Sequence, residues 1–167
     1  MNNKEKILIL NTGGTFNKVY NPITGTLDIE KNNNSIENIV QLSKIKDIKI
    51  DGILFKDSLQ ITTKDRETLV EYIKNSKFKK IIIVHGTDTI DKTAKFLDRY
   101  IKDKTIILTA AMKPYSIEKV EATANLMIGY GNLLEKKRKG IFISIHGMVK
   151  KYNKIKKNRT LGVFECQ

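Results

Sequence analysis

The sequence has few of the residues that form disulfide bonds, metal sites or reactive thiols. Its single cysteine, Cys166, is the penultimate residue, so we expect neither an intrachain disulfide nor a catalytic thiol. The two histidines and the dispersed acidic residues lack the spacing of a metal-ligand set. The sequence therefore predicts a site whose chemistry is done by hydroxyl, amino and carboxylate groups without a metal.

Long apolar runs are also missing. No segment approaches the roughly 20 apolar residues that are needed to cross a bilayer. The first residues, MNNKEK, lead into an apolar run too short to be the core of a signal peptide. We expect a protein without a membrane span, located in the cytoplasm.

The sequence has far fewer acidic residues than basic ones. The 31 Lys and Arg residues outnumber the 18 Asp and Glu residues, which gives a formal net charge of +13. Clustered cations can neutralise nucleic-acid phosphates, and residues 136–139 and 150–159 form such clusters. However, the aromatic residues that would stack on bases do not interleave these basic runs. We therefore favour a solvated basic surface over a nucleic-acid interface.

Predicted strands and helices alternate along the chain. Apolar runs predict strands at 6–10, 48–55, 81–84, 104–109 and 140–146, with a bend near residues 51–52 of the second strand. Helical periodicity predicts helices near 35–42, from residue 63, over 88–101 and over 116–134, the last interrupted or ended near Gly129 and Gly131. Residues 17–26 read as a surface loop or hairpin. The length and the alternation predict a single α/β domain over 1–167, with a mainly parallel sheet and helices on both faces.

The segment 81–91, IIIVHGTDTID, is central to this pattern. Four β-branched residues without polar alternation are typical of a strand buried on both faces. Gly86 permits a sharp bend, and Thr87, Asp88 and Thr89 follow where the next helix begins. These side chains either cap the helix or bind a ligand at the carboxyl edge of the sheet.

Two other predicted strands end in polar turns. Residues 11–16, NTGGTF, follow the first strand, and residues 56–60, KDSLQ, follow the second. The first turn lacks both the third glycine of a dinucleotide-binding loop and the Gly-Lys-Ser/Thr ending of a P-loop. We expect the three turns to converge at one edge of the sheet, in a site that does not hold phosphate.

Several hydroxyl groups could serve as a nucleophile there. No Gly-x-Ser-x-Gly motif is present, so a serine on a nucleophile elbow is excluded. His85 and His146 are expected to be structural hydrogen-bonding residues. What remains is a threonine or serine hydroxyl activated by a lysine and a carboxylate. The open candidates are Thr12, Thr15, Ser58, Thr87 and Thr89.

Four motifs together resemble the bacterial-type L-asparaginases. They are residues 11–16 (NTGGTF), 57–58 (DS), 85–89 (HGTDT) and 110–114 (AAMKP), in that order and at strand ends. The resemblance runs from about residue 6 to residue 164 and corresponds only to the larger N-terminal domain of that family. We expect the family's small C-terminal domain to be absent from this chain.

The resemblance implies a two-step hydrolysis of a side-chain amide, with Thr15 as the nucleophile and no cofactor. Thr87 would belong to a proton relay completed by Lys157, for which Lys154 and Lys156 are rivals. Tyr20 would match the tyrosine of the family's mobile active-site loop. Backbone amides at the turn of Gly13 and Gly14 and near Thr87 would form the oxyanion hole.

The resemblance also implies where the substrate, L-asparagine or L-aspartate, would bind. Asp88 would hold the α-amino group and Ser58 the α-carboxylate. The full set of expected substrate contacts is Gly14, Asp57, Ser58, Gly86, Thr87, Asp88 and Ala111. As in the family, a homo-oligomer is expected.

Three departures keep other functions open. Residues 151–154, KYNK, replace the family's Asp-Gly-Arg-Asp, and Ala110 and Lys113 replace a glycine and an arginine. The third departure is the expected loss of the C-terminal domain, which in the family contributes groups to a neighbouring subunit's site. The alternatives are an amino-acid-binding protein with impaired turnover and a basic amidase module associated with tRNA.

Overall fold

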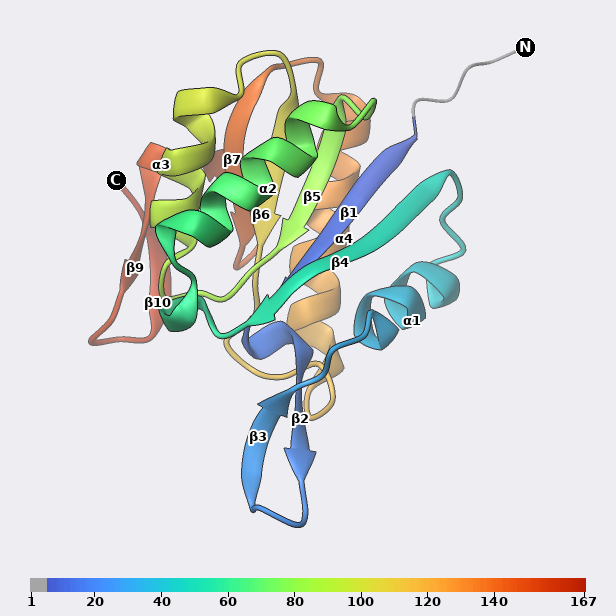
Figure 1. Ribbon diagram of the computed structural model, residues 1–167, viewed down its shortest axis with the longest axis vertical. Helices are drawn as coiled ribbons and strands as arrows, with labels where there is room; N and C mark the ends of the chain where they lie inside the picture. The colour runs from blue at the N-terminus through green and yellow to red at the C-terminus, as the bar shows by residue number, and fades with distance from the viewer. Residues whose placement is uncertain (1–5) are drawn as a thin grey trace.

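A six-stranded sheet forms the centre of the computed structural model, which describes residues 6–167 (Figure 1). Neighbouring strands are parallel except for the last, which runs antiparallel to β7. The mainly parallel α/β sheet predicted from the sequence is therefore confirmed. Across the sheet, the strands are β4 (Ile48–Lys56), β1 (Ile7–Gly13), β5 (Lys80–Val84), β6 (Thr105–Thr109), β7 (Gly140–Ile145) and β8 (Met148–Lys151).

Helices cover both faces of this sheet. α2 (Thr63–Asn75) and α3 (Ile90–Tyr100) pack on one face, and α1 (Asn34–Leu42) and α4 (Lys119–Glu135) pack on the other (Figure 1). Successive side chains of a strand point to opposite faces, so Leu8 joins the core under α2 and α3, whereas Ile9 joins the core under α1 and α4. Two covered faces explain why the strands read as continuous apolar runs.

The predicted interruption of the last long helix is wrong. α4 continues past Gly129 and Gly131 to Glu135. A Cβ on Gly129 would lie 3.2 Å from Ser144 Cβ and 3.3 Å from Ile107 Cγ2, so this glycine lets the helix lie close to β6 and β7. Packing against the sheet thus outweighs the low helix propensity of glycine.

Two small antiparallel sheets flank the central one. The predicted loop or hairpin at 17–26 is a hairpin of β2 (Lys18–Asn21) and β3 (Thr26–Ile29), which projects from the body of the molecule (Figure 1). The basic segment 150–159 contains the strand β9 (Ile155–Asn158), which the sequence analysis missed. β9 pairs with β10 (Val163–Cys166), and the pair is held to the core by the buried side chains of Ile155 and Phe164.

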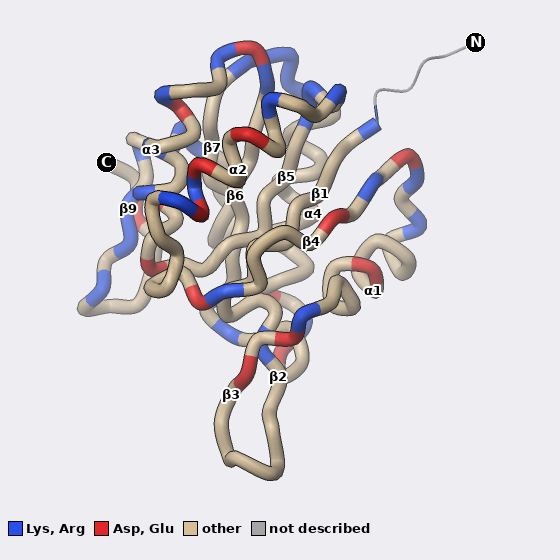
Figure 2. The backbone as a smooth tube through the Cα atoms, in the orientation of Figure 1, with Lys and Arg blue, Asp and Glu red and all other residues tan. Residues whose placement is uncertain are grey.

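The basic residues are spread over most elements of the structure and are not confined to one of them (Figure 2). Within residues 6–167, no helix combines the length and the apolar character needed to cross a membrane. The described part of the chain also contains three short 3-10 helices: η1 (Thr15–Asn17), η2 (Ser58–Gln60) and η3 (Tyr152–Lys154).

Candidate active site

The polar turns after β1, β4 and β5 meet at the carboxyl edge of the sheet, as the sequence predicted. Gly14 and Gly86 make this possible. A Cβ on Gly14, whose φ is +77°, would lie 2.5 Å from Gly86 Cα, and a Cβ on Gly86 would lie 2.6 Å from Ser58 Cβ. The Gly14 N–H also donates to Lys56 O at 2.9 Å. The backbone segments next to Thr15, Thr87 and Ser58 are therefore in direct contact, which only glycine allows.

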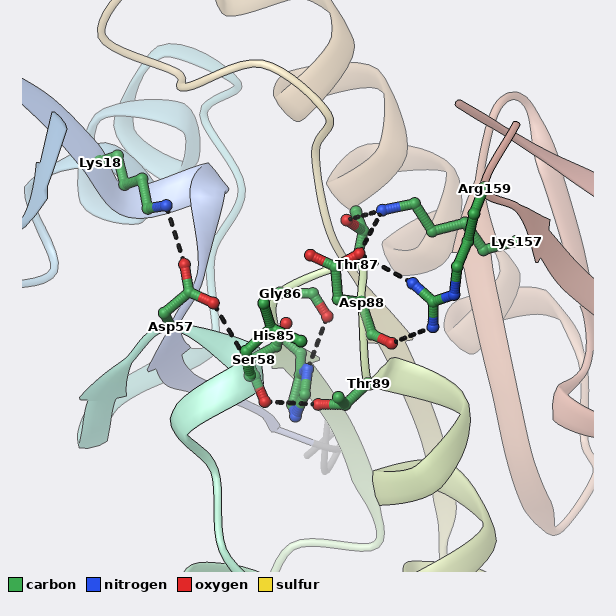
Figure 3. A network of polar contacts seen from close by, with 11 residues as sticks. Lys18, Asp57, Ser58, His85, Gly86, Thr87, Asp88, Thr89, Lys157 and Arg159 are labelled. Carbon is green, nitrogen blue, oxygen red and sulfur yellow. Dashed lines mark hydrogen bonds and ion pairs between the residues drawn. The ribbon is translucent and has the colours of Figure 1, made fainter. Parts of the chain in front are cut away.

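A lysine from a distant strand completes this edge. Lys157 Nζ, on β9, donates to Thr87 Oγ1 and to Asp88 Oδ1, each at 2.8 Å (Figure 3). Thr87 is 6% exposed, and the Lys157 side chain is 13% exposed. Of the three lysines that were candidates for this position, Lys157 is the one that the structure brings to the threonine and the carboxylate.

Arg159 also reaches Asp88, which the sequence analysis missed. Its Nη1 donates to Asp88 Oδ1 at 3.0 Å and its Nη2 to the backbone oxygen of Asp88 at 2.8 Å (Figure 3). Lys157 lies on β9 and Arg159 is the first residue of the turn that follows it, and both side chains reach Asp88 Oδ1. The partner of Arg159 lies 71 positions away in the sequence, so no local pattern predicts this contact.

Two of the five candidate hydroxyls are used to join backbone segments. Thr12 Oγ1 donates to Val84 O at 2.8 Å, and Thr89 Oγ1 donates to Ser58 O at 2.7 Å, both in buried surroundings. Thr15 is half-buried at the start of η1. Thr15, Ser58 and Thr87 thus remain as hydroxyls at the converging turns.

His85 belongs to a buried network beneath the turn. Because Gly86 O can only accept, His85 Nδ1 donates to it at 2.8 Å, and His85 Nε2 accepts from Thr93 Oγ1 at 2.9 Å. Arg66 Nε donates to the same Thr93 oxygen at 3.0 Å. Burial lowers the pKa of His85 to about 4, so the ring is neutral near pH 7. This supports the expected structural role of His85, which is to orient the Gly86 peptide.

Asp57 forms an ion pair with a residue of the β2–β3 hairpin. Lys18 Nζ lies 2.8 Å from Asp57 Oδ2, and the Leu59 N–H donates to Asp57 Oδ1 at 3.1 Å. Burial would raise the pKa of Asp57, but the hydrogen bonds from Lys18 and Leu59 outweigh burial and lower it. Both oxygens of the Asp57 carboxylate therefore already have partners within the protein, Lys18 and the Leu59 N–H. The role of Lys18 had no signal in the sequence, because a lysine in a polar hairpin is ordinary.

Two expected site residues lie apart from these contacts. The Tyr20 side chain, on β2, is 61% exposed on the projecting hairpin. Ala111 is fully buried in the core under α1 and α4, so the structure does not place it at the surface of the site.

The converging groups can carry out acid–base chemistry on a small polar molecule. Hydroxyl groups, one lysine and one carboxylate lie at an edge where parallel α/β sheets bind ligands. Among residues 6–167, no three His, Cys, Asp or Glu side chains gather in a way that could hold a metal ion.

Comparison with known proteins identifies relatives of this arrangement. The family model described as "Asparaginase, N-terminal" matches residues 6–164. The chain is 29% identical to a "Probable L-asparaginase periplasmic" of Haemophilus influenzae, over 94% of this chain and 47% of that protein. It is 30% identical to "L-asparaginase 2" of Escherichia coli, over 72% of this chain and 36% of that protein.

Solved structures give the same result. The thermostable L-asparaginase from Thermococcus kodakarensis superposes with a TM-score of 0.81 at 26% identity, covering 96% of this chain and 51% of that one. A probable cytoplasmic L-asparaginase from Campylobacter jejuni also gives 0.81 at 25% identity, covering 98% and 53%. The chain thus spans about half the length of these relatives. The chain belongs to the asparaginase family, and residues 6–164 correspond to its N-terminal domain.

Proposed function

We propose that this domain hydrolyses the side-chain amide of L-asparagine, or of a related small amide, to the acid and ammonia. The observation that carries the proposal is the contact of Lys157 Nζ with both Thr87 Oγ1 and Asp88 Oδ1. A threonine hydroxyl is a weak nucleophile until a base removes its proton, and this contact supplies a path for that proton.

In the proposed first step, Thr15 Oγ1 attacks the amide carbon. The hydroxyl proton passes through the Thr87 and Lys157 relay to the amide nitrogen, the C–N bond breaks, and ammonia leaves. In the second step, water attacks the resulting ester, a proton returns to Thr15, and the acid is released. In this proposal the Thr87 N–H stabilises the negative oxygen in both steps. The expected amides of Gly13 and Gly14 do not contribute, because Gly13 N donates to Asn11 Oδ1 at 3.0 Å and Gly14 N donates to Lys56 O at 2.9 Å.

The same arrangement supports a binding mode for the substrate. In this proposal Asp88 pairs with the α-ammonium group, and Ser58 binds the α-carboxylate. Ser58 is 2% exposed and is fixed from two sides, by the close approach of Gly86 and by the hydrogen bond from Thr89 to its carbonyl oxygen. Tyr20, on the hairpin, would contact the substrate only if the hairpin closes over the site.

We further propose that the protein works in the cytoplasm as a homo-oligomer. A second copy would cover the edge of the sheet at which the three turns converge. Light scattering on the eluting protein tests the oligomer, and fractionation of cells tests the location. A monomer at working concentration would contradict this part of the proposal.

Ammonia release from L-asparagine by the purified protein tests the proposed reaction. Thr15→Ala should lower the rate about 1,000-fold or more, because it removes the nucleophile, while the melting temperature stays unchanged. Thr68→Ala is the matched control, because Thr68 is exposed on α2 and its hydroxyl bonds only to Lys64 O of the same helix.

Two other results would have different meanings. Full activity of Thr15→Ala would show that another hydroxyl attacks. No turnover by the unmodified protein, together with a higher melting temperature in L-aspartate, would favour an amino-acid-binding role over hydrolysis.

A further inference from the structure

The Asp88 carboxylate is shared between two cations of its own chain. Lys157 Nζ and Arg159 Nη1 both donate to Oδ1, at 2.8 and 3.0 Å. Arg159 adds a second hydrogen bond through Nη2 to the Asp88 backbone oxygen at 2.8 Å. Arg159 is thus held at two points on one residue.

The backbone around Arg159 is also fixed. Asn158 Oδ1 accepts from the N–H groups of Thr160 and Leu161, both at 3.1 Å, and Gly162 N donates to Asn158 O at 2.9 Å. These bonds close the turn between β9 and β10, at the end of the strand that carries Lys157. Arg159 is therefore directed to Asp88 by the same hairpin that positions the lysine (Figure 3).

The charges at this position do not favour a further cation. Lys157, Arg159 and Asp88 together carry a formal charge of +1 at neutral pH. An α-ammonium group bound to Asp88 would be a third cation on one carboxylate and would have to compete with or displace the guanidinium. Like charges brought this close repel each other, most strongly where water is partly excluded. The Asp88 side chain is 35% exposed and the Arg159 side chain 58% exposed, so solvent screens much of the repulsion and the expected effect is small.

We propose that Arg159 is a specificity-determining residue that disfavours an α-ammonium group and selects amides of dicarboxylic acids whose α-carbon carries no cation. Succinamate, which is asparagine without its α-amino group, represents this class. The inference rests on the proposed function, because Asp88 is a substrate contact only in that proposal. The guanidinium then takes the place that the substrate's ammonium group would occupy.

The experiment compares two ligands that differ only in the α-ammonium group, L-aspartate and succinate, by calorimetric binding to the full chain. In Arg159→Ala, we expect the ratio of the L-aspartate to the succinate dissociation constant to fall about threefold to fivefold, the size expected for a partly exposed charge interaction. Arg159→Lys keeps a cation and should retain most of the original ratio. Arg99→Ala is the matched control, because it removes the same side chain from the exposed far end of α3.

Steady-state hydrolysis of L-asparagine and succinamate gives a second readout. Arg159→Ala should lower KM for L-asparagine and leave KM for succinamate within about twofold, because only the first substrate carries the repelled charge. An unchanged ligand ratio in Arg159→Ala, or equal weakening of both ligands, would overturn the proposal. Binding of neither ligand to the unmodified protein would also overturn it.

Failure of the proposed function would look different. If neither amide is hydrolysed but the dissociation constants shift as described, the hydrolytic role is wrong and the role of Arg159 stands. Alternatively, both amides are hydrolysed in a Thr15-dependent way, and the ratio of the two dissociation constants is the same in Arg159→Ala as in the unmodified protein. In that case the hydrolytic role stands and the role of Arg159 is wrong.

Discussion

Lys157 Nζ lies 2.8 Å from Thr87 Oγ1, although 70 positions in the sequence separate the two residues. The threonine follows a central strand of the sheet, and the lysine belongs to a hairpin beside it. The hairpin is held there by two buried side chains, Ile155 and Phe164, and Phe164 pairs directly with Lys157 across the two strands. The proton path of the proposed reaction therefore depends on the packing of a peripheral hairpin.

Lys157→Met tests this path. The substitution keeps the apolar stem but removes the amino group, so we expect kcat for ammonia release to fall at least about 100-fold with little change in melting temperature. Lys95→Met, on the exposed side of α3, controls for the lost charge. Full activity of Lys157→Met would show that Lys157 is not the lysine of the proton relay and would favour Lys154 or Lys156 instead.

Gly86→Ala tests the contact between the turns after β4 and β5. The new Cβ would lie 2.6 Å from Ser58 Cβ and 2.7 Å from Ser58 Oγ, so Ser58 or the turn has to move. We expect a loss of about 1–3 kcal/mol in the free energy of unfolding, as for other overpacked sites, together with a higher KM. Urea unfolding and steady-state kinetics measure the two effects, and a variant unchanged in both would show that Ser58 is not fixed by Gly86.

The two glycines of α4 should respond to alanine in opposite ways. At Gly131 an added Cβ has no neighbour within 4 Å, so Gly131→Ala should stabilise the protein by up to about 1 kcal/mol through better helix propensity. At Gly129 the added Cβ meets Ser144 and Ile107 at 3.2–3.3 Å, so the same change should destabilise the protein. Urea unfolding of both variants checks this. Equal gains would show that α4 does not need its close approach to the sheet.

The buried His85 predicts a pH dependence of stability. Its folded-state pKa of about 4 lies below the unfolded value of about 6.5, so the unfolded chain binds more protons between these values. Stability is therefore complete above pH 6.5 and falls as the pH falls toward 4. The loss between pH 8 and pH 5 is about 2 kcal/mol.

The comparison variant for this effect is His85→Asn, whose side-chain amide can still donate to Gly86 O but does not titrate. Urea unfolding at pH 8 and pH 5 should show a smaller loss of stability in the variant than in the unmodified protein. Equal losses would assign the pH dependence to other groups.

The sequence was sufficient to predict the architecture and most of the converging site. Unbroken apolar strands such as 81–84 require two covered faces, and polar turns at the ends of parallel strands must share an edge. These rules depend only on local sequence and on strand direction. They correctly brought together the turns of Gly14, Ser58 and Thr87.

The features that the sequence did not predict depend on tertiary packing. α4 runs through Gly129 because the sheet beneath it needs a residue without a side chain, and helix propensity contains no such information. The sequence did not predict β9 because its residues, IKKN, are few and mostly basic. The segment is a strand because it pairs with β10 and buries the side chain of Ile155. The contacts of Lys18 and Arg159 with acidic partners 39 and 71 positions away are equally invisible in a single sequence.

The position of β1 in the sheet has a consequence for local motion. β1 pairs with both β4 and β5 from Ile7 to Asn11, and beyond that point it is tied to β4 alone, through the pairing of Gly13 with Lys56 and the bond from the Gly14 N–H to Lys56 O. The turn that carries Thr15 therefore follows directly on the paired centre of the sheet, and we expect it to open with that centre as one cooperative unit. Its backbone amide protons should exchange with solvent as slowly as those of the core, whereas the exposed amides of the β2–β3 hairpin should exchange much sooner.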